Sequence, residues 1–113
     1  MGILITDSRS IPLREGTIGR ALGFSGFEPL KSYVGKKDLF GRKTRVTKSN
    51  LADALAAAAV MEMGEGDEQT PLAVIKDALV VFTTKPLSAK AKKLFLDPEK
   101  DIFAGVYLGV EGN

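Results

Sequence analysis

The chain has 113 residues with 16 basic and 14 acidic side chains, and its formal net charge of +2 is too balanced to indicate a nucleic-acid-binding protein. It contains no cysteine and no histidine, which excludes disulfides, thiol nucleophiles, zinc fingers and imidazole chemistry, so any bound metal would be a hard ion held through oxygen. With 44% hydrophobic residues the chain is long enough for one core, and we expect a single domain over residues 1–113.

The first expected element is a short strand over residues 3–6 that ends at Asp7 and Ser8. Pro12 then places residues 9–16 in a loop, because proline is excluded from central strands. The apolar start meets the charge of Asp7 too early for a signal sequence or a membrane span. We therefore expect a cytoplasmic protein with no membrane partner, and polar groups at the end of this strand are candidates for function.

Residues 17–26 predict a second strand with three glycines, a spacing that suits close approach by another backbone or by a ligand. Packing against a helix and contact with a ligand remain alternatives here. Residues 27–34 contain Pro29 and predict an irregular segment or a short edge strand. Residues 36–43 carry mixed charge and predict a turn, for which a solvated hairpin is favoured over a functional loop.

Residues 49–64 predict the central helix of the protein. Ser49 can cap its start, four consecutive alanines lie in its interior, and Gly64 can end it. The helix has almost no polar face, so we expect a core helix that sheets or a second subunit contact on more than one side. Its lone interior carboxylate, Asp53, must be paired, metal-bound, protonated or at the rim, because an unpaired buried charge is very costly.

The junction between the alternating residues 44–48 and this helix is a possible anion site. The first turn of a helix offers free N–H groups and a partial positive charge to an anion. The alternative is that Ser49 satisfies those donors itself.

The second half of the chain is expected to form an acidic loop, two strands and a helix. Residues 65–71 are the loop, and their spacing does not match a calcium-binding EF-hand. Residues 72–75 predict a buried strand that forms a hairpin with a strand over 79–84. Residues 88–96 predict a short basic helix, and 97–113 a loose tail. The expected fold class is α+β, a mostly antiparallel sheet around the alanine-rich helix with a short C-terminal helix.

An ordered set of short motifs carries a resemblance to a known family. In chain order the motifs are Ile5-Thr6-Asp7-Ser8, Pro12-Leu13-Arg14-Glu15-Gly16, the glycine-spaced residues 19–26, Lys37-Asp38-Leu39-Phe40-Gly41-Arg42, Val46-Thr47, Ala52-Asp53, Met63-Gly64-Glu65-Gly66 and Pro71. In this order and spacing they resemble the later half of the gamma-glutamyl ligases of the deazaflavin coenzyme F420, best over residues 3–76. The resemblance implies a coenzyme F420-0:L-glutamate ligase, which adds L-glutamate to the lactyl-phospho side chain with GTP as a substrate and Mg²⁺ or Mn²⁺ as cofactor.

The resemblance also implies site residues. Asp7 matches the aspartate of the family's Thr-Asp-Ser motif and Asp53 that of its Ala-Asp-Glu motif, so both are expected to bind the metal ion. Ser8, Arg14 and Lys48 are expected to bind the nucleotide phosphates, with a structural ion pair as the alternative for the two cations. Activation of a carboxylate by phosphoryl transfer needs bridged phosphates and cations but no cysteine or histidine, in agreement with the composition.

The sequence departs from the family pattern at two places. Ser10-Ile11 stands where the family usually has Gly-Arg before the proline, and Ala54 stands where its helix has a glutamate. The family's enzymes also carry a preceding part of comparable size that contributes to nucleotide binding. We therefore expect a missing N-terminal half or a separate chain as partner, and no activity of this chain alone.

The resemblance implies a homodimer as well, because family members form intertwined dimers. The alternative function is a non-catalytic dimerisation or structural domain that binds no ion. In that case Asp53 would cap a backbone group or pair with Arg14, Arg45 or Lys48.

Overall fold

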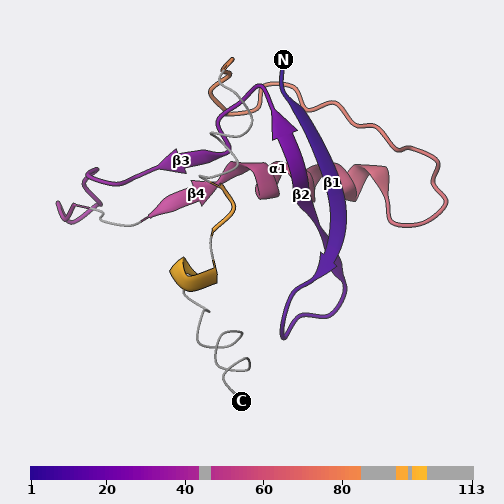
Figure 1. Ribbon diagram of the computed structural model, residues 1–113, viewed down its shortest axis with the longest axis horizontal. Coiled ribbons are helices and arrows are strands. Elements are labelled where there is room, and N and C mark those ends of the chain that lie inside the picture. The colour runs from indigo at the N-terminus through magenta and orange to yellow at the C-terminus, as the bar shows by residue number, and fades with distance from the viewer. Residues whose placement is uncertain (44–46, 85–93, 97, 102–113) are drawn as a thin grey trace.

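The computed structural model describes residues 1–43, 47–84, 94–96 and 98–101. Its elements are β1 (Ile3–Ser10), β2 (Thr17–Ser25), β3 (Leu30–Ser32), β4 (Lys48–Asn50), α1 (Leu51–Met63) and a 3-10 helix at Pro98–Lys100. Figure 1 shows the long β1–β2 hairpin crossing α1, and a smaller β3–β4 ribbon that leads into the start of the helix. These antiparallel strands, in two small sheets, and the helix give the expected α+β class.

β1 is longer than the sequence predicts. It pairs with β2 from Ile3 opposite Ser25 to Ser10 opposite Thr17, so Asp7 lies inside the strand and not at its end. The predicted end at Asp7 and Ser8 is wrong because the hydrogen-bonded ladder with β2 continues beyond them. The register shifts between Ile5 and Thr6, which is a β-bulge that increases the local twist.

The backbones of β2 and α1 touch at Gly19. A Cβ atom on Gly19 would lie 2.6 Å from the carbonyl oxygen of Ala56 and 2.5 Å from Cγ2 of Val60. A Cβ on Gly23, in the same strand, would meet nothing within 4 Å. Ala56 is fully buried by this contact. At Gly19, therefore, the glycine spacing of residues 17–26 serves tight packing against the helix.

α1 starts at Leu51, and its cap is Asn50 and not the predicted Ser49. The side-chain oxygen of Asn50 accepts the N–H of Asp53 at 3.1 Å. Ser49 is in β4, where it pairs with Lys31, and this strand pairing displaces the cap by one residue.

The two backbone N–H groups before that of Asp53 also have hydrogen-bond acceptors. The N–H groups of Leu51 and Ala52 donate to the carbonyl of Pro29, at 2.8 and 3.2 Å. The proposed anion site at the helix start is therefore already filled by the protein's own acceptors. At the other end Gly64, with φ of 85°, closes the helix as predicted and donates its N–H to Val60.

α1 buries one face only against the described residues. Ala52, Ala56 and Val60 are buried, whereas Ala54, Ala58 and Met61 are exposed. The expected contacts on more than one side of the helix are thus not all supplied by the described part of this chain. In that part, no helix is long and apolar enough to cross a lipid bilayer.

The predicted strands at 72–75 and 79–84, and the hairpin between them, are wrong. Residues 72–75 form no ladder with the described residues and are exposed. The later segment pairs with residues 26–28 over a single bridge, Phe82 with Phe27. There the N–H of Glu28 donates to the carbonyl of Val81 at 2.8 Å, and the N–H of Thr83 donates to that of Gly26 at 2.9 Å. A run of apolar residues becomes a strand only where a partner strand supplies a ladder of hydrogen bonds, and among the described residues neither run has more than this one bridge. The predicted basic helix falls mostly on residues 85–93, which lie outside the described residues, as does most of the tail.

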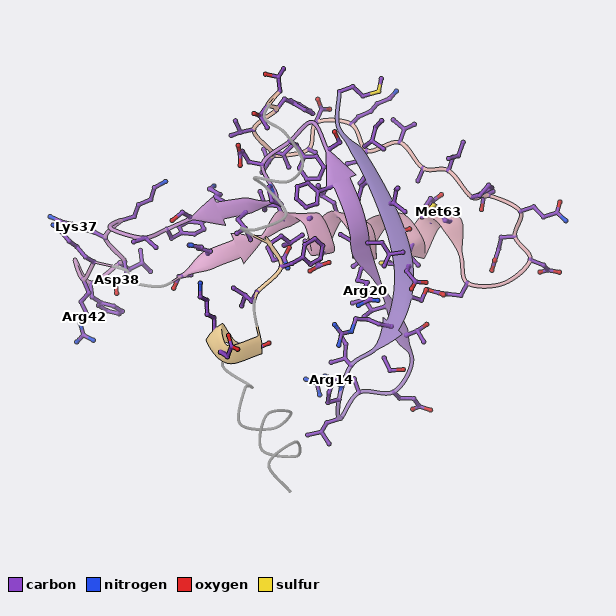
Figure 2. The ribbon with its side chains drawn as sticks, viewed as in Figure 1. Arg14, Arg20, Lys37, Asp38, Arg42 and Met63 are labelled. Atoms are coloured by element: carbon purple, nitrogen blue, oxygen red, sulfur yellow. The ribbon has the colours of Figure 1, made fainter. Side chains whose placement is uncertain are left out.

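The charged turn over residues 36–43 is exposed, as the solvated-hairpin interpretation predicts. Asp38 organises it, because one carboxylate oxygen accepts the N–H groups of Phe40 and Arg42 at 2.8 and 2.9 Å. Figure 2 shows Lys37, Asp38 and Arg42 at the far tip of the β3–β4 ribbon, away from α1.

Candidate functional site

A pocket of about 420 Å³ lies between β1 and the C-terminal end of α1. Its lining comes from the strand, the last helical turn and the loop that follows: Thr6, Asp7, Ser8, Val60, Met63, Gly64, Glu65, Gly66, Gln69, Thr70 and Pro71. Two motifs that are far apart in the sequence, Thr6-Asp7-Ser8 and Met63-Gly64-Glu65-Gly66, therefore meet at one place. Figure 2 marks Met63 at this end of the helix.

One hydrogen bond joins the two sides of the pocket. The hydroxyl of Ser8 donates to Oε2 of Glu65 at 2.5 Å. The alternation of β1 turns Thr6 and Ser8 toward α1 and leaves Asp7 exposed. Glu65 reaches Ser8 because Gly64 ends the helix and turns the chain back toward the strand.

The loop wall of the pocket is held by its own side chains. Glu68 accepts the N–H of Gly66 at 2.8 Å, and its carboxylate lies where a Cβ on Gly64 would be. The hydroxyl of Thr70 donates to the carbonyl of Met63 at 2.8 Å. These local bonds fold the acidic loop against the helix end and leave Glu65 on the pocket side.

The pocket offers oxygen donors of the kind that hard cations prefer. Glu65 supplies a carboxylate, and Thr6, Ser8 and Thr70 supply hydroxyls, whereas the alternation of β1 directs the side chain of Asp7 to the other face of the strand at the border of the pocket. Among the described residues no three acidic side chains gather in one group. Mg²⁺ commonly takes only one or two protein carboxylates together with waters and substrate phosphates, so this donor set fits Mg²⁺ or Mn²⁺.

Asp53 lies outside the pocket and its oxygens are engaged. Oδ1 accepts the buried N–H of Ala21 at 2.8 Å, and Oδ2 accepts a hydrogen bond from the side-chain amide of Asn50. Asp53 thus fastens the first turn of α1 to the face of β2 that carries Ala21, whereas Asp7 projects from the opposite face of the hairpin. Backbone capping is the contact expected of Asp53 in a structural role, and its metal-binding role stays a prediction.

The two predicted phosphate-binding cations do not line the pocket. Figure 2 places Arg14 at the tip of the β1–β2 hairpin, and Lys48 is the exposed first residue of β4. Arg45, an alternative partner of Asp53, falls outside the described residues. Of the predicted site residues the structure therefore brings Asp7 and Ser8 together, and the phosphate roles of Arg14 and Lys48 stay predictions.

Two site candidates were missed from the sequence. Glu65 was counted with the acidic loop, although its place directly after the helix-ending Gly64 could have singled it out. Arg20 pairs in register with Asp7 across the hairpin, and its Nε is buried without a hydrogen-bond partner among the described residues. Strand alternation could have placed this cation on the same face as Asp7.

Known proteins are similar to this chain over most of its length. Residues 1–77 match the family described as F420-0:Gamma-glutamyl ligase. The coenzyme F420:L-glutamate ligase of Methanococcus maripaludis is 41% identical over 103 residues, which are 91% of this chain and 40% of that protein. The corresponding ligase of Methanocaldococcus jannaschii is 40% identical over the same shares, and that of Archaeoglobus fulgidus is 41% identical over 76 residues, 67% of this chain and 30% of that protein. The chain spans about 40% of the length of the first two relatives.

Proposed function

The chain belongs to the F420-0:Gamma-glutamyl ligase family, and from this premise we propose that it supplies part of the catalytic site of a ligase that joins L-glutamate to coenzyme F420-0. The observation that carries the proposal is the meeting of Thr6-Asp7-Ser8 with Met63-Gly64-Glu65-Gly66 at one polar pocket. Both segments lie inside the part of the chain that matches the family.

The proposed pocket chemistry is the binding of a divalent ion together with nucleotide phosphates. Forming an amide from a carboxylate requires that the carboxylate first be activated, and GTP can supply the phosphoryl group. Glu65 would hold Mg²⁺ or Mn²⁺, which neutralises phosphate charge when bound, and the metal-binding role of Asp7 stays a prediction from the family motif. The hydroxyl of Ser8 donates its hydrogen bond to Glu65, so the Ser8 oxygen keeps its lone pairs for the ion.

Calorimetric titration with Mn²⁺, with and without GTP, tests this proposal. We expect saturable binding that weakens roughly 10-fold or more in Glu65→Gln, because this variant removes the charged ligand of the pocket, and Asp7→Asn tests whether the carboxylate of the strand motif binds the ion as well. Glu62→Gln is the matched control, since Glu62 is an exposed carboxylate of α1 outside the pocket. Circular dichroism of each variant checks that the fold is kept.

Two outcomes would contradict the proposed site. Binding that is lost in Asp53→Ala but kept in Glu65→Gln would move the ion to the start of the helix. An absence of heat at millimolar Mn²⁺, with and without GTP, would favour the non-catalytic alternative for this chain.

A further inference from the structure

Glu65 stands between two glycines, which restrain its backbone only weakly. Gly64 ends α1 with φ of 85°, and Gly66 follows Glu65 directly. Glycine populates more backbone conformations than any other residue, so holding a side chain between two glycines in one direction costs much conformational entropy. The hydrogen bond between Ser8 and Glu65 is therefore easier to keep where another contact restrains this turn.

The carboxylate of Glu68 lies against both glycines. A Cβ atom on Gly64 would overlap this carboxylate, with Oε1 only 2.8 Å away. A Cβ atom on Gly66 would lie 3.6 Å from Oε2 and 3.8 Å from Oε1. The same Oε2 accepts the N–H of Gly66 at 2.8 Å. Glu68 thus occupies the space that a side chain on Gly64 would take, and it holds the backbone on both sides of Glu65.

Glu68 makes these contacts from outside the polar pocket. Its neighbours Gly66, Gln69 and Thr70 line the pocket together with Glu65, but Glu68 does not. A carboxylate outside the lining is not placed to be a ligand of an ion in the pocket. Glu68 can act on such an ion only through the backbone that it holds.

We propose that Glu68 is a positioning residue of the polar pocket, which holds Glu65 toward Ser8 and so prepares Glu65 to bind a divalent ion. Removing a group that orients a metal ligand typically lowers metal affinity roughly 10- to 100-fold. What Glu68 supplies is an acceptor oxygen for the N–H of Gly66, and its negative charge is not required. The proposal rests on the proposed function where the ion is concerned, but the orientation of Glu65 is measurable without an ion.

Three variants separate the acceptor oxygen of Glu68 from its charge. Glu68→Gln keeps a side-chain oxygen that can accept the N–H of Gly66, whereas Glu68→Ala removes it. Asp67→Ala is the matched control, because Asp67 is an exposed carboxylate of the same loop that does not line the pocket. Circular dichroism of each variant checks that α1 is kept.

Nuclear magnetic resonance of the metal-free chain measures the orientation of Glu65. We expect a nuclear Overhauser effect between the side chains of Ser8 and Glu65 in wild type, in Glu68→Gln and in Asp67→Ala, since each keeps an acceptor for the N–H of Gly66. This signal should be lost in Glu68→Ala, and the amide of Gly66 should exchange faster there. A signal of wild-type strength in Glu68→Ala overturns the proposal, as does its absence from wild type.

Calorimetric titration of the same proteins with Mn²⁺ measures the consequence for the ion. The affinity should fall roughly 10-fold in Glu68→Ala and stay within about two-fold of wild type in Glu68→Gln and Asp67→Ala. An equal loss in Glu68→Gln or in Asp67→Ala would assign the effect to charge and overturn the positioning role. Absence of Mn²⁺ binding by wild type, with the side-chain signal lost only in Glu68→Ala, would contradict the proposed function and support the positioning of Glu65.

Discussion

The two ends of α1 are built in opposite ways. At the N-terminal end the first three backbone donors of the helix have acceptors within the chain: Asn50 accepts the N–H of Asp53, and Pro29 accepts those of Leu51 and Ala52. At the C-terminal end Gly64 and Glu65 open onto a polar pocket. One helix thus carries an N-terminal end whose donors are used by the fold and a C-terminal end that lines a polar pocket.

This difference shows how to judge whether a carboxylate is available to bind a ligand. Asp53 is the unusual residue of the helix in the sequence, but both its oxygens accept hydrogen bonds from Ala21 and Asn50. Glu65 is one of several acids in the loop, yet it lines the pocket and is bonded to Ser8. What a carboxylate can bind depends on which of its oxygens are already used, and composition does not reveal this.

The largest loss of stability is expected where Gly19 contacts Ala56 and Val60, because both ends of α1 depend on this contact. Gly19→Ala should lower the free energy of unfolding by about 2–3 kcal/mol, because a new Cβ would force α1 away from β2. Gly23→Ala is the control in the same strand, where a Cβ meets nothing. Urea denaturation followed by circular dichroism measures both, and equal losses would show that the helix does not rest on Gly19.

The second prediction tests whether Asp53, at the N-terminal end of α1, has a structural role. Asp53→Ala should lower the free energy of unfolding by about 2 kcal/mol, because the buried N–H of Ala21 loses its acceptor. Mn²⁺ affinity should stay within about two-fold of wild type, since a two-fold change is only about 0.4 kcal/mol. Glu62→Ala is the control for loss of a negative charge on α1. A variant with normal stability and no ion binding would reverse the comparison between the two ends.

The smallest effect separates the two candidate caps. Asn50→Ala should lower the free energy of unfolding by about 1 kcal/mol, because the side chain of Asn50 accepts the N–H of Asp53. Ser49→Ala should cost less than about half of that, because of the two side chains only that of Asn50 accepts a helix N–H. Thermal unfolding of the two variants provides the measurement. The opposite order would restore Ser49 as the cap.

The sequence was sufficient where local chemistry decides the structure. Strong helix formers and Gly64 define α1, and the residues near Ile3 and Thr17 predicted two strands, although not their pairing or the full length of β1. The cap was misplaced by one residue because Ser49 and Asn50 are both good caps, and only the pairing of Ser49 with Lys31 separates them.

The rest depended on contacts between distant residues. The bond between Ser8 and Glu65 joins positions 57 apart, and that between Ala21 and Asp53 joins positions 32 apart. No periodicity or local motif encodes such pairs. The strand predicted at 72–75 was wrong for a related reason, because its apolar pattern signals burial without naming the partner that provides it.

The turn over residues 36–43 has a practical consequence. Asp38 closes it with its own backbone bonds, and it lies at the tip of the β3–β4 ribbon, far from α1 (Figure 2). Loop tips of this kind tolerate added sequence, and among the described residues the backbone bonds of Asp38, Phe40, Gly41 and Arg42 are made within the turn itself. A fluorescent label or an affinity tag inserted there would report on the protein while the polar pocket stays accessible.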